Sequence, residues 1–481
     1  MIGIILDDQS FEQDIRELLM AFYPGESFTR EEMPGGEQSL LIRSRTSEAS
    51  FELTVEDLEK GIVKSSVTEA DFSDRFETKN RIKRMLYKIL RELTGISLPW
   101  GTLTGIRPTK IAMTKLLEGW EDEKVRSYMK DTYYTGSQKI DLSLEIAKRE
   151  IDILSSIDYE NGYSLYVGIP FCPTTCLYCS FTSFPIGHWE KRMNQYLEAL
   201  FTEMDYVAGK MAGRNLDTVY IGGGTPTSLS AFHLEQLITR LKKTFDFSGV
   251  KEFTVEAGRP DSITEDKLRV LKDYGVTRIS INPQTMKQET LDIIGRRHTV
   301  DMVKDCFLMA RSMGFDNINM DLIVGLPEED VEDVIRTMEE IQALNPDGIT
   351  VHSLAIKRAA RLNMFKERYG DLKITNTPEM IEVTADYARK MGQEPYYLYR
   401  QKNMAGNFEN VGYSRPGKAC IYNILIMEEK QTIIACGAGT TTKVVYPAEN
   451  RLERVENVKD VEQYMARIDE MLERKERLLD S

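Results

Sequence analysis

Cysteine is scarce in this sequence, which makes any cluster of it informative. The chain has 481 residues and only 6 cysteines. Cys172, Cys176 and Cys179 lie together in the stretch FCPTTCLYCSF, with the spacing C-x3-C-x2-C. At this usage such a spacing would arise by chance in about one sequence per thousand, so it requires a chemical explanation. The scattered Cys306, Cys420 and Cys436 are expected to be small buried apolar residues.

Long apolar runs and targeting segments are also missing. No run of apolar residues reaches the length of about eighteen that a transmembrane helix needs. The N-terminal stretch MIGIILDDQSFEQDIRELL lacks the basic region and cleavage site of a signal peptide. We therefore expect a cytoplasmic protein with no membrane partner. In that reducing compartment, clustered cysteines favour metal binding or redox chemistry over disulfides.

Positive charge is in deficit. The formal net charge is −14, which disfavours non-specific nucleic-acid binding, and no nucleic-acid partner is expected. One basic segment, KNRIKRMLYKILREL, suggests a helix over Lys79–Leu93. It is interpreted as an ordinary helix with Ile82, Met85, Leu86 and Ile89 turned to the core, and a binding surface is the alternative.

The length predicts two to four domains. Residues 1–155 are expected to form an α+β domain of unknown role. Its elements would be a strand, a helix, three strand-like runs and two long helices. In chain order these are Ile2–Leu6, Phe11–Phe22, Ser39–Arg43, Ser50–Thr54, Gly61–Ser66, Asp74–Leu93 and Lys139–Ile157.

From residue 156 to about 370, short apolar runs alternate with helical patterns. The six predicted strands are Ser164–Ile169, Thr218–Ile221, Lys251–Glu256, Arg278–Asn282, Asn317–Ile323 and Gly348–Leu354. Alternation of this kind favours a parallel sheet with helical crossovers, here a (β/α)6 partial barrel, whose sites lie at the carboxyl ends of the strands.

Residues 371–481 predict a mixed C-terminal region. Two strands are expected, at Gln431–Ala435 and Thr442–Tyr446. A final helix over residues 458–478 would cap the barrel or lie across its mouth.

The cysteine loop directly follows the first predicted barrel strand. A structural zinc site needs four nitrogen or sulfur ligands, and only His188 lies near the three cysteines. Thiolates at such close spacing can hold a [4Fe–4S] cluster, and three of them would leave one iron open. An open iron can bind a substrate or cofactor through nitrogen and oxygen donors. The count of three therefore predicts a reactive cluster.

C-x3-C-x2-C after the first strand of a β/α barrel resembles the radical SAM superfamily. There the open iron binds S-adenosylmethionine, which an electron from the cluster cleaves to methionine and a 5′-deoxyadenosyl radical. The longer stretch YVGIPFCPTTCLYCSF resembles the oxygen-independent coproporphyrinogen III oxidase family, and within it the coproporphyrinogen dehydrogenase branch.

The resemblance extends to other strand ends. In YIGGGTPTSL it implies that Gly223, Gly224 and Thr225 contact S-adenosylmethionine, while Tyr166 packs against the cluster-bound molecule. Glu256 matches a glutamate that binds the nucleoside. A second S-adenosylmethionine site is implied by a further set of residues. These are Tyr178, Gly224, Gln284, Arg296, Asp321 and Ala355.

Several positions depart from the family pattern. Gly168 stands where a histidine is usual, and Phe181 stands where established decarboxylases have a fourth cysteine and the haem-chaperone branch has phenylalanine. The third strand reads EAGRP, one residue longer than the family's E-x-x-P, and the fourth reads NPQ in place of GVQ. These differences weaken the transfer of an exact substrate.

Three functions follow from the resemblance. The first is oxidative decarboxylation of coproporphyrinogen III to protoporphyrinogen IX in haem biosynthesis, with an electron donor such as flavodoxin or ferredoxin. The alternatives are a haem-binding chaperone and a radical methyltransferase acting on a tetrapyrrole. A tetracarboxylate substrate would need cations, for which Arg400, Lys402, Arg415 and Lys418 are candidates. A monomer is expected.

Overall fold

The computed structural model describes residues 1–33, 36–181, 183–355, 372–401, 408–449 and 451–480. They divide into two compact units, Met1–Lys148 with a short segment that begins at Arg400, and the chain from Arg149 onward without that segment. Each unit has its own large sheet. Among the described residues, no helix is long and apolar enough to cross a membrane.

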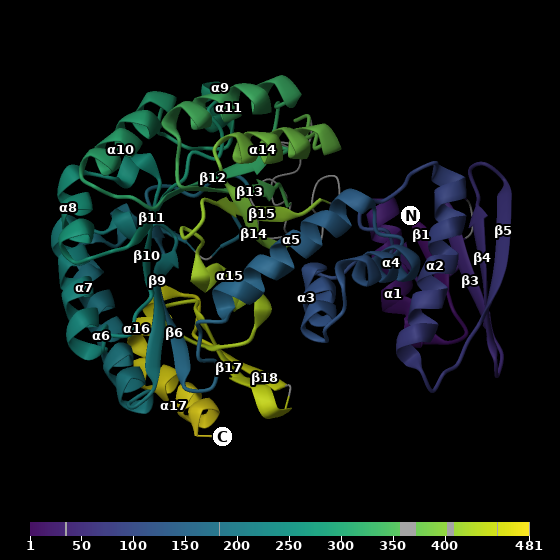
Figure 1. Cartoon of the computed structure of the whole chain (residues 1–481), viewed down its shortest axis with the longest axis horizontal. Coiled ribbons are helices and arrows are strands. Elements are labelled where there is room, and N and C mark those ends of the chain that lie inside the picture. The colour runs from purple at the N-terminus through teal and green to yellow at the C-terminus, as the bar shows by residue number, and fades with distance from the viewer. Residues whose placement is uncertain (34–35, 182, 356–371, 402–407, 450, 481) are drawn as a thin grey trace. The chain divides into compact units, whose positions relative to one another are not determined.

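The N-terminal unit is built on a five-stranded sheet of order β2-β1-β3-β4-β5. Strand β4 alternates strictly between buried and half-buried residues, so one sheet face is apolar, and α1 and α2 lie along it (Figure 1). The predicted strands and helices of this region are confirmed, but β2, α3 and α4 were not foreseen. The elements are β1 (Ile2–Ile5), α1 (Glu12–Phe22), β2 (Phe28–Thr29), β3 (Leu40–Thr46), β4 (Ser50–Asp57), β5 (Ile62–Glu69), α2 (Arg75–Thr94), α3 (Thr109–Leu117), α4 (Asp122–Tyr133) and α5 (Ser137–Leu154).

The basic segment forms helix α2. Asp74 caps its N-terminus by accepting a hydrogen bond from the Glu77 N–H, and Gly95 ends it with a left-handed backbone, φ 72°. The four apolar residues expected to face the core are all buried. They are Ile82, Met85, Leu86 and Ile89. The interpretation as a core-packed helix is therefore confirmed.

The second unit contains an eleven-stranded sheet of order β14-β15-β13-β12-β11-β10-β9-β6-β16-β17-β18. Its centre is the predicted series of six parallel strands in chain order, which confirms an open α/β partial barrel. The strands are β6 (Gly162–Ile169), β9 (Asn215–Gly223), β10 (Glu252–Gly258), β11 (Arg278–Ile281), β12 (Ile318–Val324) and β13 (Gly348–Ser353).

Helices connect these strands and cover the outer face of the sheet (Figure 1). They are α6 (Met193–Lys210), α7 (Ala231–Thr244), α8 (Glu265–Asp273), α9 (Gln288–Ile293), α10 (Val300–Ser312) and α11 (Val331–Leu344). Most residues of the central strands are buried. This is why the strands appear in the sequence as short, nearly continuous apolar runs.

Strands from the C-terminal region extend both sides of the barrel series. On one side β16 (Thr432–Cys436) pairs in parallel with β6, and β17 (Thr441–Tyr446) and β18 (Arg451–Glu456) follow. On the other, β15 (Asn410–Ser414) and β14 (Glu394–Tyr399) add antiparallel strands next to β13. Strand β6, which carries the cysteine loop, is therefore an internal strand with a parallel neighbour on each side.

The C-terminal stretch forms two helices, where one was expected. Helices α16 (Val461–Ala466) and α17 (Ile468–Leu479) pack against α6 instead of lying across the strand ends. A buried carboxylate explains this placement. Glu203 on α6 accepts hydrogen bonds from Lys475, Asn457, Tyr464 and the Gly437 N–H.

Candidate functional site

The cysteine loop lies at the carboxyl end of β6 and is held by the glycine turn that follows β9. The Gly224 N–H donates to the Ile169 carbonyl at 2.8 Å, and the Thr225 N–H donates to the Phe171 carbonyl at 2.7 Å. The Thr225 hydroxyl oxygen lies 3.4 Å from the Cys172 sulfur. The predicted contact residues of two successive strands therefore meet at one edge of the sheet.

Two positions of this turn require glycine because a side chain would clash with neighbouring atoms, and at Gly223 the backbone conformation also requires it. A Cβ atom on Gly224 would lie 2.6 Å from the Phe171 carbonyl oxygen and 2.9 Å from the Cys172 sulfur. Gly223 has φ +115°, and its Cβ would lie 3.0 Å from backbone atoms of Ile169. Any side chain here would push the loop outward, so the turn forms a close backbone cradle beside the cysteine.

On its other side, the loop is anchored to the segment after α9. Leu177 inserts into a small apolar core that includes Leu291 and Ile294, and its N–H donates to the Ile294 carbonyl at 2.9 Å. Arg296 donates to the Tyr178 hydroxyl at 3.1 Å, so these two predicted residues meet. Burial alone would lower the pKa of Arg296, but Tyr178 and the nearby Cys176 raise it. The Arg296 Nε is buried, with no partner among the described residues.

Glu256 lies at the carboxyl end of β10 and points toward β9. It accepts a hydrogen bond of 2.6 Å from the Tyr220 hydroxyl. Burial is the main cause that raises the pKa of Glu256 to about 7, and Asp321 adds to the increase, whereas hydrogen bonds from Tyr220 and the Gly223 backbone oppose it. At pH 7 about half of the side chains are therefore ionised, and that form can accept hydrogen bonds from hydroxyl groups of a ligand.

Gln284 stands in a strained backbone conformation between β11 and β12. Its φ is +71°, although it is not a glycine. Its N–H donates to the Asp321 carbonyl at 3.0 Å, and its own carbonyl accepts from the Ile323 N–H at 2.9 Å. The side-chain Oε1 is buried, with no partner in the described part of the chain. Strain of this kind and an unbonded buried oxygen are typical of a ligand site.

Tyr166 belongs to a stack of tyrosines that the sequence did not predict. Tyr166 and Tyr220 are stacked at 5.9 Å, and Tyr422 lies 4.5 Å from Tyr220 and 6.0 Å from Tyr166. Tyr422 comes from α15 (Ile421–Glu428), on the opposite face of the sheet from the outer helices (Figure 1). The alternation along β9 places Tyr220 on the same face as Gly222, but no local pattern marks Tyr422. Ala355 is the last described residue before the gap at 356–371.

The thiol environment fits a cationic cluster. Burial raises the pKa of Cys172 and raises that of Cys179 to about 11, so both would be neutral without a cation nearby. Among the residues that the structure describes, no group of three His, Cys, Asp or Glu side chains forms a ready-made site for a single metal ion. A four-iron cluster makes a different demand, because each thiolate binds its own iron. Three thiols beside an open backbone cradle fit that demand.

The proposed substrate cations are not gathered at this edge. Arg400 is buried in the N-terminal unit, where it donates to the Leu103 carbonyl at 2.7 Å. Arg415 and Lys418 contact Asp347 and Asp316, which precede strands β13 and β12. They therefore lie at the amino ends of the strands, and Lys402 lies outside the described residues.

Two histidines, His298 and His352, also belong to the barrel unit. His298 is fully buried, and its ring lies within hydrogen-bond reach of the Pro283 backbone. Burial lowers its pKa to about 4, so the ring is neutral. The His352 Nδ1 lies 3.3 Å from the Tyr399 hydroxyl oxygen.

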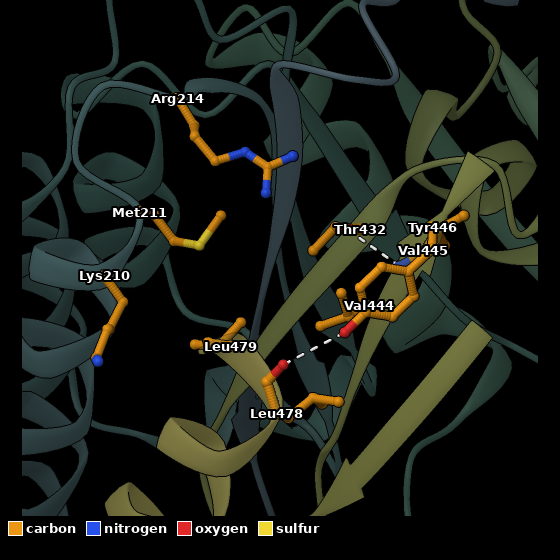
Figure 2. Close-up of a pocket in the computed structure, with 9 residues that line it drawn as sticks. All are labelled: Lys210, Met211, Arg214, Thr432, Val444, Val445, Tyr446, Leu478 and Leu479. Atoms are coloured by element: carbon orange, nitrogen blue, oxygen red, sulfur yellow. Dashed lines mark hydrogen bonds between the residues drawn. The ribbon is translucent and has the colours of Figure 1, made fainter. Parts of the chain in front are cut away.

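A separate pocket of about 280 Å³ lies between the end of α6, the start of β16 and the end of β17 (Figure 2). Lys210 and Arg214 approach it from the end of α6, and Thr432 begins β16. Lys210 is bonded to Asp480, and Arg214 donates to the Glu160 carbonyl. None of the predicted site residues lines this pocket.

Comparison with known proteins identifies a shared domain, a relative that matches most of the chain and a relative that matches half of it. Residues 166–341 match the radical SAM superfamily. The chain is 40% identical over 408 residues to "Oxygen-independent coproporphyrinogen-III oxidase-like protein HemZ" of Bacillus subtilis, covering 84% of this chain and 81% of that protein. It is 33% identical over 244 residues to "Heme chaperone HemW" of the same organism, covering 50% of this chain and 63% of that protein.

A solved structure supports the fold. The coproporphyrinogen III oxidase HemN of Escherichia coli, described as a radical SAM enzyme, matches with a TM-score of 0.53 and 24% identity. The match covers 65% of this chain and 70% of that chain. At this identity the likeness bears on the architecture alone.

Proposed function

Because this chain belongs to the radical SAM family of oxygen-independent coproporphyrinogen III oxidase-like proteins, we propose that it oxidatively decarboxylates coproporphyrinogen III to protoporphyrinogen IX. The family implies a [4Fe–4S] cluster and S-adenosylmethionine. When bound, these cofactors supply the radical that abstracts a hydrogen atom from a propionate side chain. The observation that carries the proposal is the 40% identity to an oxidase-like relative over 84% of the chain.

The cysteine loop has the proposed role of holding the cluster. Cys172, Cys176 and Cys179 would each bind one iron, which leaves the fourth open to S-adenosylmethionine. Gly223, Gly224 and Thr225 support this assignment, because the turn they form lies directly against Cys172 and has no room for a side chain at Gly224. The glycine turn would let the cofactor approach the backbone closely.

The remaining strand ends would orient the cofactor and the substrate. Glu256 would accept hydrogen bonds from the ribose hydroxyls, and the stacked Tyr166 would pack against the same molecule. A second S-adenosylmethionine site would use a set of residues at the ends of other barrel strands and in the loops that follow them. Its members are Tyr178, Gly224, Gln284, Arg296, Asp321 and Ala355. The unbonded Gln284 Oε1 and Arg296 Nε support a ligand at that place.

For the reaction itself, hydrogen abstraction from the β-carbon of a propionate would be followed by loss of CO₂ and one electron, leaving a vinyl group. Two propionates would react in turn, and an external acceptor would take the electrons. The protein's contribution would be to position the propionate and exclude water.

A haem-binding chaperone is the second candidate, and Phe181 favours it. The side chain is 72% exposed and stands where decarboxylases of the family have a fourth cysteine. Similarity does not separate the two candidates, because the relative whose match covers 84% of this chain is named only oxidase-like, and the match to the chaperone relative covers 50%.

An anaerobic assay separates these functions. Reconstituted protein is incubated with a reductant, S-adenosylmethionine and coproporphyrinogen III, and Cys176→Ala protein serves as the control. Protoporphyrinogen with two CO₂ per substrate is the expected result. Stoichiometric haem binding without 5′-deoxyadenosine formation would establish the chaperone instead, and a methylated tetrapyrrole would establish a methyltransferase.

A further inference from the structure

Arg259 lies in the EAGRP motif, which is one residue longer than the family's E-x-x-P, in the turn between β10 and the short helix that begins at Pro260. Its side chain is only 3% exposed. The guanidinium forms a fork with Asp261, with Nε donating to Oδ1 at 2.9 Å and Nη2 donating to Oδ2 at 2.6 Å. A planar fork held at two points has little freedom to turn, so its remaining nitrogen has a fixed direction.

That remaining nitrogen, Nη1, points into the cysteine loop. It donates to the Thr174 carbonyl at 2.9 Å and to the Thr174 hydroxyl at 2.7 Å. It also lies 3.7 Å from the Cys176 sulfur, within hydrogen-bond distance for a sulfur acceptor. One buried side chain therefore binds the backbone of the loop and one of its thiols together.

We propose that Arg259 is a positioning residue of the iron–sulfur cluster, which holds the cysteine loop through Thr174 and raises the cluster's reduction potential through an N–H···S bond to Cys176. The inference rests on the proposed role of Cys176 as a cluster ligand. It goes beyond that role, because neither the three-cysteine motif nor the contacts with S-adenosylmethionine require an arginine here.

The sign of the effect on the potential follows from charge. Reduction adds an electron to the cluster, and part of the added charge lies on the thiolate sulfurs. A hydrogen-bond donor to such a sulfur stabilises the reduced state more than the oxidised state and raises the potential. Asp261 neutralises most of the net charge of Arg259, so the local N–H donor makes the main contribution.

Potentiometric titration of the reconstituted holoprotein, followed by the EPR signal of the reduced cluster, tests this inference. The comparison is made at the midpoint potential of the wild-type cluster. There, Arg259→Gln should lower the ratio of reduced to oxidised cluster about tenfold, which corresponds to a midpoint potential lower by 59 mV for a one-electron couple. Arg259→Lys should behave like Arg259→Gln, because an ammonium group bonded to Asp261 lacks the rigid fork. Arg311→Gln is the matched control, since Arg311 also binds an aspartate, Asp347, but at the amino ends of the strands. It should leave the potential unchanged.

An Arg259→Gln protein with full iron content and a ratio within twofold of wild type would overturn the inference. Should that variant not retain iron, Arg259→Lys provides the test, because it keeps a positive charge beside Asp261 and loses the fork. A potential equal to that of wild type in Arg259→Lys protein with full iron content would also overturn the inference. Failure of the proposed function has a different signature, namely wild-type protein that holds no four-iron cluster or Cys176→Ala protein that retains it fully.

Discussion

The two edges of the parallel sheet use buried carboxylates in different ways. At the amino edge, Asp217 and Glu252 are saturated with protein partners, although the Arg278 Nε and the Asn317 Oδ1 there have none in the described part of the chain. Asp217 binds Lys251 at 2.8 Å and Gln431 at 2.6 Å, and Glu252 accepts N–H groups of Ile421 and Tyr422 at the start of α15. At the carboxyl edge, Glu256 has one bonded hydroxyl, and Gln284 Oε1 and Arg296 Nε have no partner among the described residues.

This difference separates stability from function within one sheet. A carboxylate with several partners holds strands and helices in place. A buried polar group with too few partners reduces stability until a ligand satisfies it. Substitutions at the amino edge should therefore change the free energy of unfolding, and those at the carboxyl edge should change cofactor binding.

The largest effect is expected at the cysteines. Cys176→Ala should lower reductive cleavage of S-adenosylmethionine at least a hundredfold, because losing a ligand costs more than losing a residue that merely supports one. Iron and sulfide content after anaerobic reconstitution is the measurement. Cys436→Ala, at a buried thiol of β16, is the control and should keep its iron. Equal iron loss in both variants would mean that the effect is a folding defect.

The next effect concerns pH. The pKa of Glu256 is about 7 in the folded protein and 4.5 in a free side chain. The folded state therefore binds more protons between these values, and the stability of the cofactor-free protein should fall as pH rises from 4.5 to 7. Glu256→Gln should make the free energy of unfolding decrease by about 3 kcal/mol less over this pH range than it does in wild type. Denaturant unfolding across this pH range measures it.

Glu329 is the control that separates the pH effect from cofactor binding. Burial also raises its pKa to about 7, although Thr285 donates a hydrogen bond to it. Glu329→Gln should flatten the same pH range, whereas only Glu256→Gln should weaken binding of S-adenosylmethionine in a titration. A Glu256→Gln protein with the wild-type pH profile would contradict the interpretation of the carboxyl edge.

A smaller effect is expected from adding one methyl group. Gly224→Ala places a Cβ 2.6 Å from the Phe171 carbonyl oxygen and should destabilise the protein by about 1–3 kcal/mol. Gly209→Ala on α6 meets nothing within 4 Å and should stabilise it by about 0.5–1 kcal/mol. Chemical denaturation of the two variants checks the opposite signs, and destabilisation by both would refute the steric argument.

The smallest effect is expected at the amino edge. Asp347 binds Arg311 at 2.8 Å and the Ile318 N–H at 2.9 Å, but both of its arginine partners are half-exposed. Asp347→Asn should therefore cost about 1 kcal/mol of unfolding free energy. Its iron content and cofactor affinity should equal those of wild type. A loss of cluster in this variant would break the proposed division between the edges.

The central strands could be predicted because each is a short apolar run followed by a helical pattern. The predicted strands Gln431–Ala435 and Thr442–Tyr446 are also confirmed, as β16 and β17, but local sequence does not show that they extend the barrel sheet. β16 pairs with β6 across more than 260 residues of chain, as in the pair Ile433 and Ser164. β18 has the sequence RLERVE, whose charges suit a helix as well as an edge strand. Long-range pairing, not local propensity, decides both.

The candidate site divides in the same way. Residues that follow successive parallel strands must converge at one edge, so Thr225, Glu256 and Gln284 could be placed from sequence order alone. Tyr422 and Arg259 could not. Tyr422 reaches the stack from a C-terminal helix, and the contact of Arg259 with Thr174 depends on how two loops fold.

The parallel neighbours on both sides of β6 have a consequence for a protein whose proposed cofactor is sensitive to oxygen. Ladder bonds to β9 and β16 fix β6 on either side, with the β9 ladder reaching Ile169 and the β16 ladder Val167. Oxidative loss of the cluster would then leave the sheet intact, and the loop beyond Pro170 would keep its hydrogen bonds to Thr225, Ile294 and Arg259. Repair would require only that new iron enter the loop, with no need for the domain to refold.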